Sequence, residues 1–279
     1  RITVENIGAE ESIVSGQVLE KQPFRFSKSI GGHRAAIETA VDTILDRLGE
    51  RLHSKEEIDG VGHRVVHGGE RFTGSVLIDD DVIRAIEAAS ELAPLHNPEN
   101  LKGYRAARSI LPYAHQVAVF DTAFRQTMPP RAYLYGLPYS FYERYRIRRY
   151  GFHGTSHRYV TERFAQLRGS TPEKFKLITC HLGNGCSMTA VDRGRSVDSS
   201  MGFTPLEGLM MGTRSGDVDP AAVLWLMERE NLSTQEAARI LNQKSGLLGL
   251  SGVDSDMRAV LERARQGDNR SELAIDVFC

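Results

Sequence analysis

Residues 175–220 read FKLITCHLGNGCSMTAVDRGRSVDSSMGFTPLEGLMMGTRSGDVDP, and the rest of the chain is arranged around them. The apolar run at 175–180, bounded by turn residues, is typical of a buried strand. The Asn184-Gly185 pair that follows is a strong hairpin signal, so residues 187–191 are expected to form the return strand. A second turn then leads into a third expected strand at residues 195–198.

Two glycine-containing loops in this region favour anion binding. Gly183 and Gly185 flank Asn184 and leave backbone N–H groups open to a phosphate oxygen. The loop is not a Walker loop, because no Gly-Lys-Ser/Thr follows and the chain continues into a strand. Downstream, glycines surround Arg214, whose guanidinium group on a tight loop can bind an oxyanion with two hydrogen bonds. A Gly-Asn-Gly hairpin also has a purely structural interpretation, but the second loop shifts the balance towards an anion site.

Composition places the chain among ordinary globular enzymes. Its 279 residues are 41% hydrophobic and 25% charged, enough for two domains. Because 35 Lys and Arg residues face 36 Asp and Glu residues, the formal net charge is −1 and gives no case for nucleic acid or an anionic membrane as partner. The three cysteines lack metal or redox spacing, which favours a reduced, cytoplasmic protein. We find neither a signal peptide nor an apolar run of the ~18 residues that a membrane helix requires.

The order of the elements indicates an α/β fold. Strand-like segments alternate with helical patterns, and polar residues gather at strand ends. The two ends read as the inside of a strand and of a helix, so we expect a piece of a longer protein. We place the domain boundary between residues 125 and 126, giving an N-terminal domain at 1–125 and a second, nucleotide-binding domain at 126–279. Before residue 125 we expect short strands over residues 1–30, helices at 33–48 (with a glycine cap at Gly49), 81–90 and 99–111, and strands at 61–69 and 117–120. The helix at 33–48 is expected to bury one apolar face, made of Ile37, Val41, Ile44, Leu45 and Leu48. After it the expected helices cover 156–167 (capped by Thr155 or Ser156) and 220–230 (capped by Asp219), then begin at Ser233 and near Asp256.

Six charged or imidazole side chains lie in loops next to these elements. In α/β sheets, ligands bind beyond the carboxyl ends of the strands, which makes the segment from Arg64 to Gly69 and Asp121 site candidates. Two guanidinium groups, several imidazoles, one carboxylate and a glycine-rich loop suit phosphoryl transfer, in which charge neutralisation dominates. The six residues are Arg64, His96, Asp121, His153, His181 and Arg214.

Two H-x₃-H pairs, His63/His67 and His153/His157, invite a zinc interpretation. The first pair lies on strand-like sequence and the second spans a helix start. Neither has the glutamate of the metalloprotease motif. A zinc protein therefore remains a distant alternative, and we assign no metal ligand.

Six motifs together resemble the acetate kinase family of acyl-phosphate-forming kinases. They occur in the family's order and spread over nearly the whole chain. The motifs are HRVVHGGERF (63–72), FDTAF (120–124), RRYGFHGTSH (148–157), TCHLGNG (179–185), DSSMGFTPLEGLMMGTRSGDVDP (198–220) and GVDSDMR (252–258).

The resemblance implies a two-domain actin-like ATPase fold of the sugar kinase and ribonuclease H-like type, with mixed sheets flanked by helices. It also implies a transferase of acetate metabolism that converts ATP and acetate to ADP and acetyl phosphate, with Mg²⁺ or Mn²⁺, in a cytoplasmic homodimer. Carried over by motif, the catalytic residues are Asp121, His153 and Arg214, and the nucleotide-binding residues are His181, Leu182, Gly183, Asn184, Gly185, Asp256, Met257 and Arg258. The substrate-binding set is Arg64, Val66, Leu95, His96, Phe152 and Pro205.

The sequence also departs from the family. Arg125 stands where the family usually has histidine, Cys186 replaces a small residue, and Ser199 replaces threonine. The family's N-terminal Asn/Gly/Ser-rich motif, its C-terminal Gly-x-Gly-Glu-Asn motif and its late magnesium-binding glutamate have no match. Two alternatives therefore stay open: a propionate or butyrate kinase, because one methylene is worth only ~1–3 kcal/mol, and an inactive nucleotide-binding module.

Overall fold

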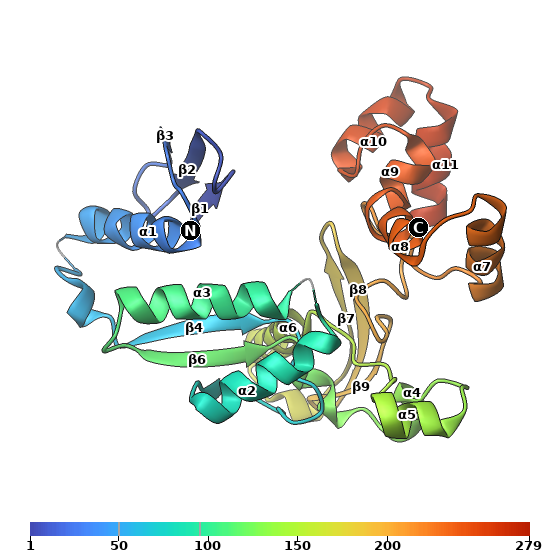
Figure 1. Cartoon of the computed structure of the whole chain (residues 1–279), viewed down its shortest axis with the longest axis horizontal. Coiled ribbons are helices and arrows are strands. Elements are labelled where there is room, and N and C mark those ends of the chain that lie inside the picture. Colours follow the sequence, from blue (N-terminus) through green and yellow to red (C-terminus); the bar gives the residue numbers. More distant parts are fainter. Residues whose placement is uncertain (50, 95) are drawn as a thin grey trace. The chain divides into compact units, whose positions relative to one another are not determined.

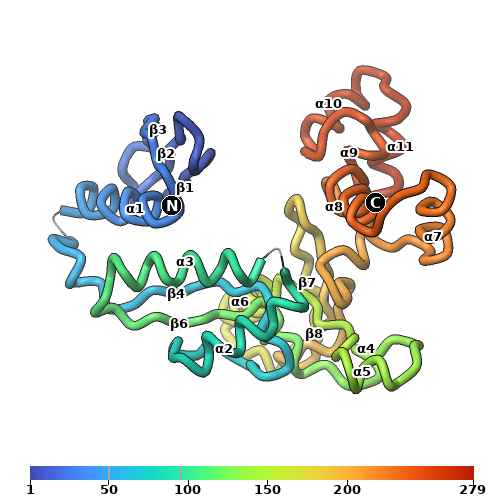
Figure 2. Tube along the Cα trace, in the orientation of Figure 1, coloured from blue at the N-terminus to red at the C-terminus, as the bar shows by residue number. Residues whose placement is uncertain are grey.

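The computed structural model describes residues 1–49, 51–94 and 96–279. These residues form two units, whose elements Figures 1 and 2 show coloured along the chain. Unit 1 comprises Arg1–Gly68 and Gly74–Phe120, and unit 2 comprises Gly69–Thr73 and Asp121–Cys279. The domain boundary expected after residue 125 stays a prediction.

Unit 1 begins with a three-stranded antiparallel sheet in the order β1-β2-β3. Val14, which is fully buried on β2, packs with Ile30 and Ala36 in the centre of this sheet's apolar cluster. The short strands expected over the first 30 residues are therefore present. They are β1 (Ile2–Glu5), β2 (Ser12–Gly16) and β3 (Phe24–Lys28).

Helix α1 (His33–Leu48) has the bounds expected from the sequence but buries a different face. The expected apolar positions, Ile37 among them, are only half-buried, whereas Ala36, Thr39 and Thr43 are buried. These small side chains let the helix pack closely, and the Thr43 hydroxyl donates to the Thr39 carbonyl at 2.6 Å, so it is not left unpaired. The predicted glycine cap is wrong in conformation, because Gly49 has φ −48°, a right-handed rather than a left-handed value.

The second sheet of unit 1 has the strand order β4-β6-β5. Strands β4 (Gly60–Val65) and β6 (His115–Phe120) are parallel, with Val65 opposite Phe120, and β5 (Val76–Leu77) pairs antiparallel to β6. Strand β4 ends at Val65, four residues earlier than expected, because the chain turns where two asparagines of a neighbouring helix bind its backbone. The helical segments around this sheet are η1 (Lys55–Glu57), α2 (Asp80–Ala88), η2 (Ala89–Glu91) and α3 (Asn97–Ile110).

Unit 2 is built on the antiparallel sheet β7-β8-β9, the meander predicted from residues 175–198. Its strands are β7 (Lys176–Leu182), β8 (Cys186–Asp192) and β9 (Arg195–Ser199). The two turns differ. Arg193 and Gly194 both have positive φ, 51° and 78°, as a tight two-residue hairpin turn requires. Residues 183–185 instead form a three-residue loop between the paired Leu182 and Cys186.

Helical segments follow and precede this sheet in unit 2. Two predicted caps are confirmed: Asp219 accepts from the Ala221 N–H at 2.8 Å, and Ser233 with Glu236 forms a capping box. The segments before the sheet are η3 (Ala123–Thr127), α4 (Pro130–Tyr133), α5 (Tyr139–Tyr145), α6 (Gly154–Leu167) and η4 (Pro172–Lys174). Those after it are α7 (Pro220–Arg229), α8 (Thr234–Gln243), α9 (Gly246–Ser251), α10 (Met257–Arg265) and α11 (Asn269–Phe278).

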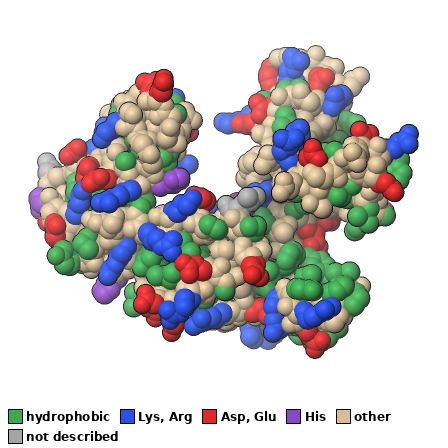
Figure 3. All heavy atoms as spheres, in the orientation of Figure 1, with side chains coloured by type: hydrophobic (Ala, Val, Ile, Leu, Met, Phe, Trp, Pro, Cys, Tyr) green, Lys and Arg blue, Asp and Glu red, His purple; other side chains and the backbone are tan. Residues whose placement is uncertain are grey.

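Charged side chains of both signs are interspersed over the face shown in Figure 3, in keeping with the formal net charge of −1. None of the helices in the described ranges is long and apolar enough to cross a bilayer.

Candidate active site

The tip of the β7–β8 hairpin borders a hollow of about 590 Å³ in unit 2. Leu182, Gly183 and Asn184 line it from the hairpin, and Asp256 and Met257 line it from the start of α10. The structure thus brings together two of the predicted nucleotide-binding segments, which are more than 70 residues apart in sequence. Of the predicted set, His181, Gly185 and Arg258 are not among the lining residues. The hollow is completed by five residues that the sequence did not single out for this role: Cys186, Gly212, Leu247, Ser255 and Phe278.

Gly212 fixes the hairpin tip to the loop that carries Arg214. Its N–H donates to the Asn184 carbonyl at 3.0 Å. A Cβ placed on Gly212 would lie 1.9 Å from Asn184 Oδ1 and 2.9 Å from the Ser255 carbonyl, so only glycine allows this approach. The glycine pair around Thr213-Arg214-Ser215 was the sequence signal for this loop.

Asp256 caps the N-terminus of α10. Its carboxylate accepts from the Arg258 N–H at 2.9 Å, and the exposed Arg258 guanidinium folds back onto the same carboxylate, with Nε 3.0 Å from Oδ1. These hydrogen bonds lower the pKa of Asp256 to about 2, so the cap is ionised at neutral pH. The carboxylate and guanidinium charges at this edge of the hollow therefore largely neutralise each other.

Asp121 and His153 are held next to each other through the main chain. The N–H of Gly154, the first residue of α6, donates to the Asp121 carbonyl at 2.9 Å, and a Cβ on Gly154 would lie only 2.1 Å from that oxygen. His153 precedes the helix in a left-handed conformation, with φ 57°. The prediction that Thr155 or Ser156 caps α6 is wrong. The helix begins at Gly154, and the Ser156 hydroxyl instead lies 2.8 Å from Nδ1 of His181.

His153 and Arg214 flank the same glycine of the hairpin tip. A Cβ placed on Gly185 would lie 3.4 Å from Nε2 of His153 and 3.3 Å from Nη1 of Arg214. The His181 ring stacks on the His153 ring with centroids 4.0 Å apart, which limits rotation of His153. Arg214 is anchored by donating from Nη1 to the Pro205 carbonyl at 2.9 Å. An imidazole, a guanidinium and a glycine-rich turn therefore converge within unit 2.

Arg125 is a fully buried cation that contacts the residue before His153. Its guanidinium donates to the Phe152 carbonyl at 2.9 Å and to the Ser196 hydroxyl at 3.1 Å. Burial lowers the pKa of Arg125 to about 9, against the opposing effect of Asp121 and Asp198, so the side chain is charged at neutral pH. Sequence comparison alone marked Arg125 as a departure from the family and gave no role for it.

The predicted acyl-substrate residues fall in both units. Phe152 is buried and Pro205 half-buried in unit 2. In unit 1, Arg64 is an exposed residue of β4, and Val66 follows that strand. Leu95 lies outside the described residues, and His96 is the half-buried residue that precedes α3.

Two asparagines of α3 hold the turn after β4 in unit 1. The Asn100 side chain accepts from the Val66 N–H at 3.0 Å. Asn97, fully buried, accepts from the His67 N–H at 3.1 Å and donates to the His67 carbonyl at 3.0 Å. These three bonds fix the backbone beside Arg64, which a candidate binding loop requires.

The second histidine of the His153/His157 pair contacts two hydroxyl groups. His157 is buried, and its Nδ1 lies 2.7 Å from the Thr179 hydroxyl. Its Nε2 lies 2.8 Å from the Ser187 hydroxyl, which is also 2.8 Å from Nδ1 of His153. Within the described ranges, no group of three or more His, Cys, Asp or Glu side chains is arranged to hold a metal ion.

Burial lowers the pKa of His157 to about 3, and the nearby charge of Arg125 acts in the same direction. The unfolded chain therefore binds a proton at this residue below pH ~6.5, whereas the folded chain does not. The free energy of unfolding is expected to fall as the pH drops from ~6.5 towards 3, by at most about 1.4 kcal/mol per pH unit from this residue. Urea unfolding of the wild type and of His157→Gln over this range measures the effect, and equal pH slopes for the two proteins would contradict it.

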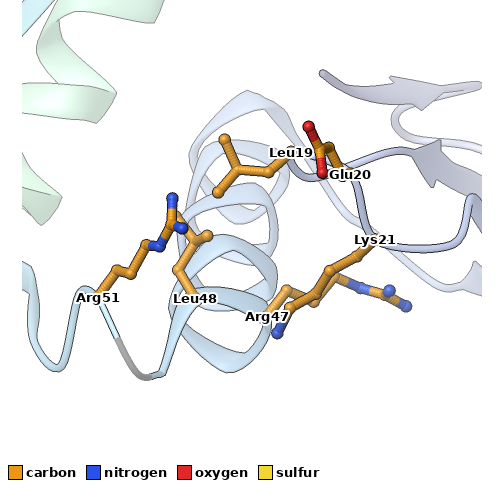
Figure 4. A pocket seen from close by; sticks show the side chains of 6 residues that line it. All are labelled: Leu19, Glu20, Lys21, Arg47, Leu48 and Arg51. Atoms are coloured by element: carbon orange, nitrogen blue, oxygen red, sulfur yellow. The ribbon is translucent and has the colours of Figure 1, made fainter.

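A separate hollow of about 440 Å³ lies in unit 1, between α1 and the segment after β2 (Figure 4). It contains none of the predicted site residues. The Arg47 guanidinium, one of its cations, stacks on the Phe24 ring at 3.9 Å. The lining residues are Leu19, Glu20, Lys21, Arg47, Leu48 and Arg51.

Comparison with known proteins decides the family. Residues 2–279 match the Acetokinase family. The chain belongs to the acetokinase family. The acetate kinase of Desulfitobacterium hafniense (strain DSM 10664 / DCB-2) is 54% identical over 275 residues, which cover 99% of this chain and 69% of that protein.

Solved structures of the acetokinase family agree with this assignment. Porphyromonas gingivalis acetate kinase superposes with a TM-score of 0.91 at 46% identity, over 99% of this chain and 69% of that one. A propionate kinase from Francisella tularensis gives a TM-score of 0.90 at 42% identity with the same coverage. These likenesses confirm the actin-like ATPase fold and the kinase family expected from the motifs.

Proposed function

We propose that this acetokinase-family chain transfers the terminal phosphoryl group of ATP to acetate, giving ADP and acetyl phosphate, and that it runs the reaction in both directions. The observation that supports this most directly is the convergence of His153, Arg214 and the Gly183–Gly185 loop beside the hollow in unit 2. Such an arrangement supplies hydrogen-bond donors and positive charge to a phosphoryl group, which is most of what this reaction needs from a protein.

The hollow would take the nucleotide. The segment from His181 to Gly185 would bind its phosphates, through backbone N–H groups other than that of Gly183, which donates to the Gly185 carbonyl at 3.2 Å. The start of α10, with Asp256, Met257 and Arg258, would lie along the adenosine. The apolar Leu247 and Phe278, which line the same hollow, would add contact area for the base. Affinity for the nucleotide would then depend on residues separate from those that stabilise the transition state.

Acetate needs no general base, because a carboxyl group that titrates near ~4 is already ionised at neutral pH. The nucleophile requires orientation and charge compensation instead. From the motif resemblance we assign the carboxylate to Arg64 and His96, and contact with the methyl group to Val66, Leu95, Phe152 and Pro205. His153 and Arg214 would stabilise the charge on the transferred phosphoryl group.

Magnesium is the metal that the family implies. Mg²⁺ in nucleotide sites is usually held by one or two carboxylates together with the phosphates and water, and Asp121, buried and fixed through Gly154, offers one such carboxylate. Asp121 would therefore orient the metal or its waters rather than accept a proton. When bound, the ion would neutralise charge on the phosphates. The homodimeric state and the cytoplasmic location expected from the sequence stay predictions.

A coupled assay tests this function. With ATP, Mg²⁺ and acetate, trapping of acetyl phosphate as the hydroxamate is expected, and kcat/KM across acetate, propionate and butyrate measures the acyl preference. A higher kcat/KM with propionate would favour the alternative of a propionate kinase, the activity named for the solved structure from Francisella tularensis. Nucleotide binding without any acyl phosphate in the assay would overturn the proposed activity in favour of an inactive nucleotide-binding module.

A further inference from the structure

The Ser187 hydroxyl stands between two imidazoles. It lies 2.8 Å from Nδ1 of His153 and 2.8 Å from Nε2 of His157. On its far side, His157 continues to the Thr179 hydroxyl at 2.7 Å. Ser187, Thr179 and His157 are all buried, and they come from β8, β7 and α6 respectively. The result is a hydrogen-bonded chain of four side chains that ends at His153.

A serine hydroxyl has one hydrogen, so Ser187 can donate to only one of its two neighbouring rings and must accept from the other. His157 carries a single ring hydrogen, because burial keeps its pKa near 3 and the ring neutral. One nitrogen of His157 is therefore a donor and the other an acceptor. Two arrangements satisfy every contact, and they differ in the direction in which all three hydrogen bonds point.

Only one of these arrangements suits a neutral His153 beside a phosphoryl group. Phosphoryl oxygens offer acceptors alone, so Nε2 of His153, the nitrogen on the side of Gly185 and Arg214, has to carry hydrogen. Nδ1 must then accept from Ser187, Ser187 must accept from Nε2–H of His157, and Nδ1 of His157 must accept from Thr179. Each placement follows from the one before it.

We propose that Ser187, His157 and Thr179 form a relay that fixes the tautomer of His153, so that its Nε2–H points to the transferred phosphoryl group. They are positioning residues, and His153 alone contacts the substrate. The proposal rests on the proposed function in taking a phosphoryl group as the partner of His153. It also gives His157, the second histidine of the GFHGTSH motif, a role that does not involve zinc.

The test uses ¹⁵N-histidine-labelled full-length protein, in which long-range ¹H–¹⁵N spectra identify the hydrogen-bearing nitrogen of each ring. Wild-type His153 is expected as a single Nε2–H tautomer. Ser187→Ala is expected to give a mixture, and so is Thr179→Val, whose side chain lies three hydrogen bonds away from His153. An unchanged His153 tautomer in both variants would overturn the relay.

Kinetics provide the second measurement. Ser187→Ala is expected to lower kcat at least ~10-fold with little change in KM for ATP, because misdirecting one transition-state donor costs up to ~10²–10³ in rate. Thr179→Val is expected to lower kcat by a smaller factor, and Ser187→Thr, which keeps a hydroxyl, to restore most of the loss. A Ser187→Ala protein with normal kcat contradicts the proposal.

Thr189→Val is the matched control. Thr189 lies two residues beyond Ser187 on β8, pairs with Thr179 across the sheet, and is equally buried, but its hydroxyl has no hydrogen-bond partner among the described residues. Its replacement is expected to leave both the tautomer and kcat unchanged. The spectra distinguish the two proposals. If Thr179→Val disturbs a fixed His153 tautomer in a protein that lacks acetate kinase activity, the proposed function is wrong but the relay is supported. If Ser187→Ala fails to fold, the tautomer and kcat of Thr179→Val and Ser187→Thr still test the relay.

Discussion

Arg214→Ala is expected to lower kcat by ~10³-fold or more, because an arginine that stabilises the charge of a phosphoryl transition state is commonly worth that factor. The structure places Nη1 of Arg214 3.3 Å from a Cβ built on Gly185, which also lies 3.4 Å from Nε2 of His153, and Arg214 is not among the residues that line the hollow proposed for the nucleotide. The dissociation constant for ATP is therefore expected to change by less than ~10-fold. Steady-state kinetics together with calorimetric ATP titration measure both quantities.

Two further variants sharpen this prediction. Arg214→Lys keeps the charge but loses the planar pair of donors, so it is expected to recover only part of kcat. Arg195→Ala removes an exposed arginine of β9 in the same unit and serves as the control, with activity close to wild type. Near-normal turnover of Arg214→Ala combined with weakened ATP binding would remove Arg214 from the catalytic role and make it a nucleotide ligand.

The elements that sequence patterns predicted well are those set by local chemistry. Helix α7 begins at Pro220 behind its Asp219 cap, and α8 begins after the Ser233–Glu236 capping box. In each case one side chain satisfies a backbone N–H within three residues, so the signal lies entirely in the local sequence. The three strands of the β7–β9 meander are likewise bounded by turn residues that the sequence displays.

Elements set by tertiary contacts were predicted less well. Helix α6 begins at Gly154 because that residue's N–H reaches the Asp121 carbonyl, 33 residues earlier, and local capping preferences cannot foresee this contact. The Ser156 hydroxyl that looked like a cap is used by His181 instead. In α1, close packing buries the face with Ala36, Thr39 and Thr43, although the helix also carries longer apolar side chains such as Ile37.

The candidate site shows the same division. Loops with contiguous motifs, such as residues 181–185 and 212–216, were found because glycine, asparagine and arginine are visible in one short segment. Leu247, Phe278 and the bridging Ser187 were missed as site residues, because a leucine, a phenylalanine or a serine on a regular element carries no signal by itself. Their roles depend on what the fold places beside them. Whether Arg64 and His96 of unit 1 bind the substrate stays a prediction.

Gly154→Ala is expected to damage both stability and catalysis, although it adds only one methyl group. The new Cβ would lie 2.1 Å from the Asp121 carbonyl oxygen and 3.2 Å from Cβ of Phe124, and both the oxygen and the start of α6 belong to the main chain. Relief of the overlap must move α6 away from Asp121 and weaken the 2.9 Å bond between Gly154 N–H and that carbonyl. Overpacking of this kind typically costs ~1–3 kcal/mol of unfolding free energy.

The catalytic cost of Gly154→Ala is expected to exceed its cost in stability, because His153 and Asp121 are joined through this one glycine. A shift of about 1 Å at reacting groups can lower the rate ~10²-fold, and we expect a loss of at least that size in kcat. Gly136→Ala, at an exposed position where an added Cβ meets nothing within 4 Å, is the control for the substitution itself. If urea unfolding shows the expected loss while kcat stays normal, the spacing of Asp121 and His153 does not matter to catalysis. The role assigned to Asp121 would then have to be given up, because a metal-orienting carboxylate cannot move by such a distance without affecting the rate.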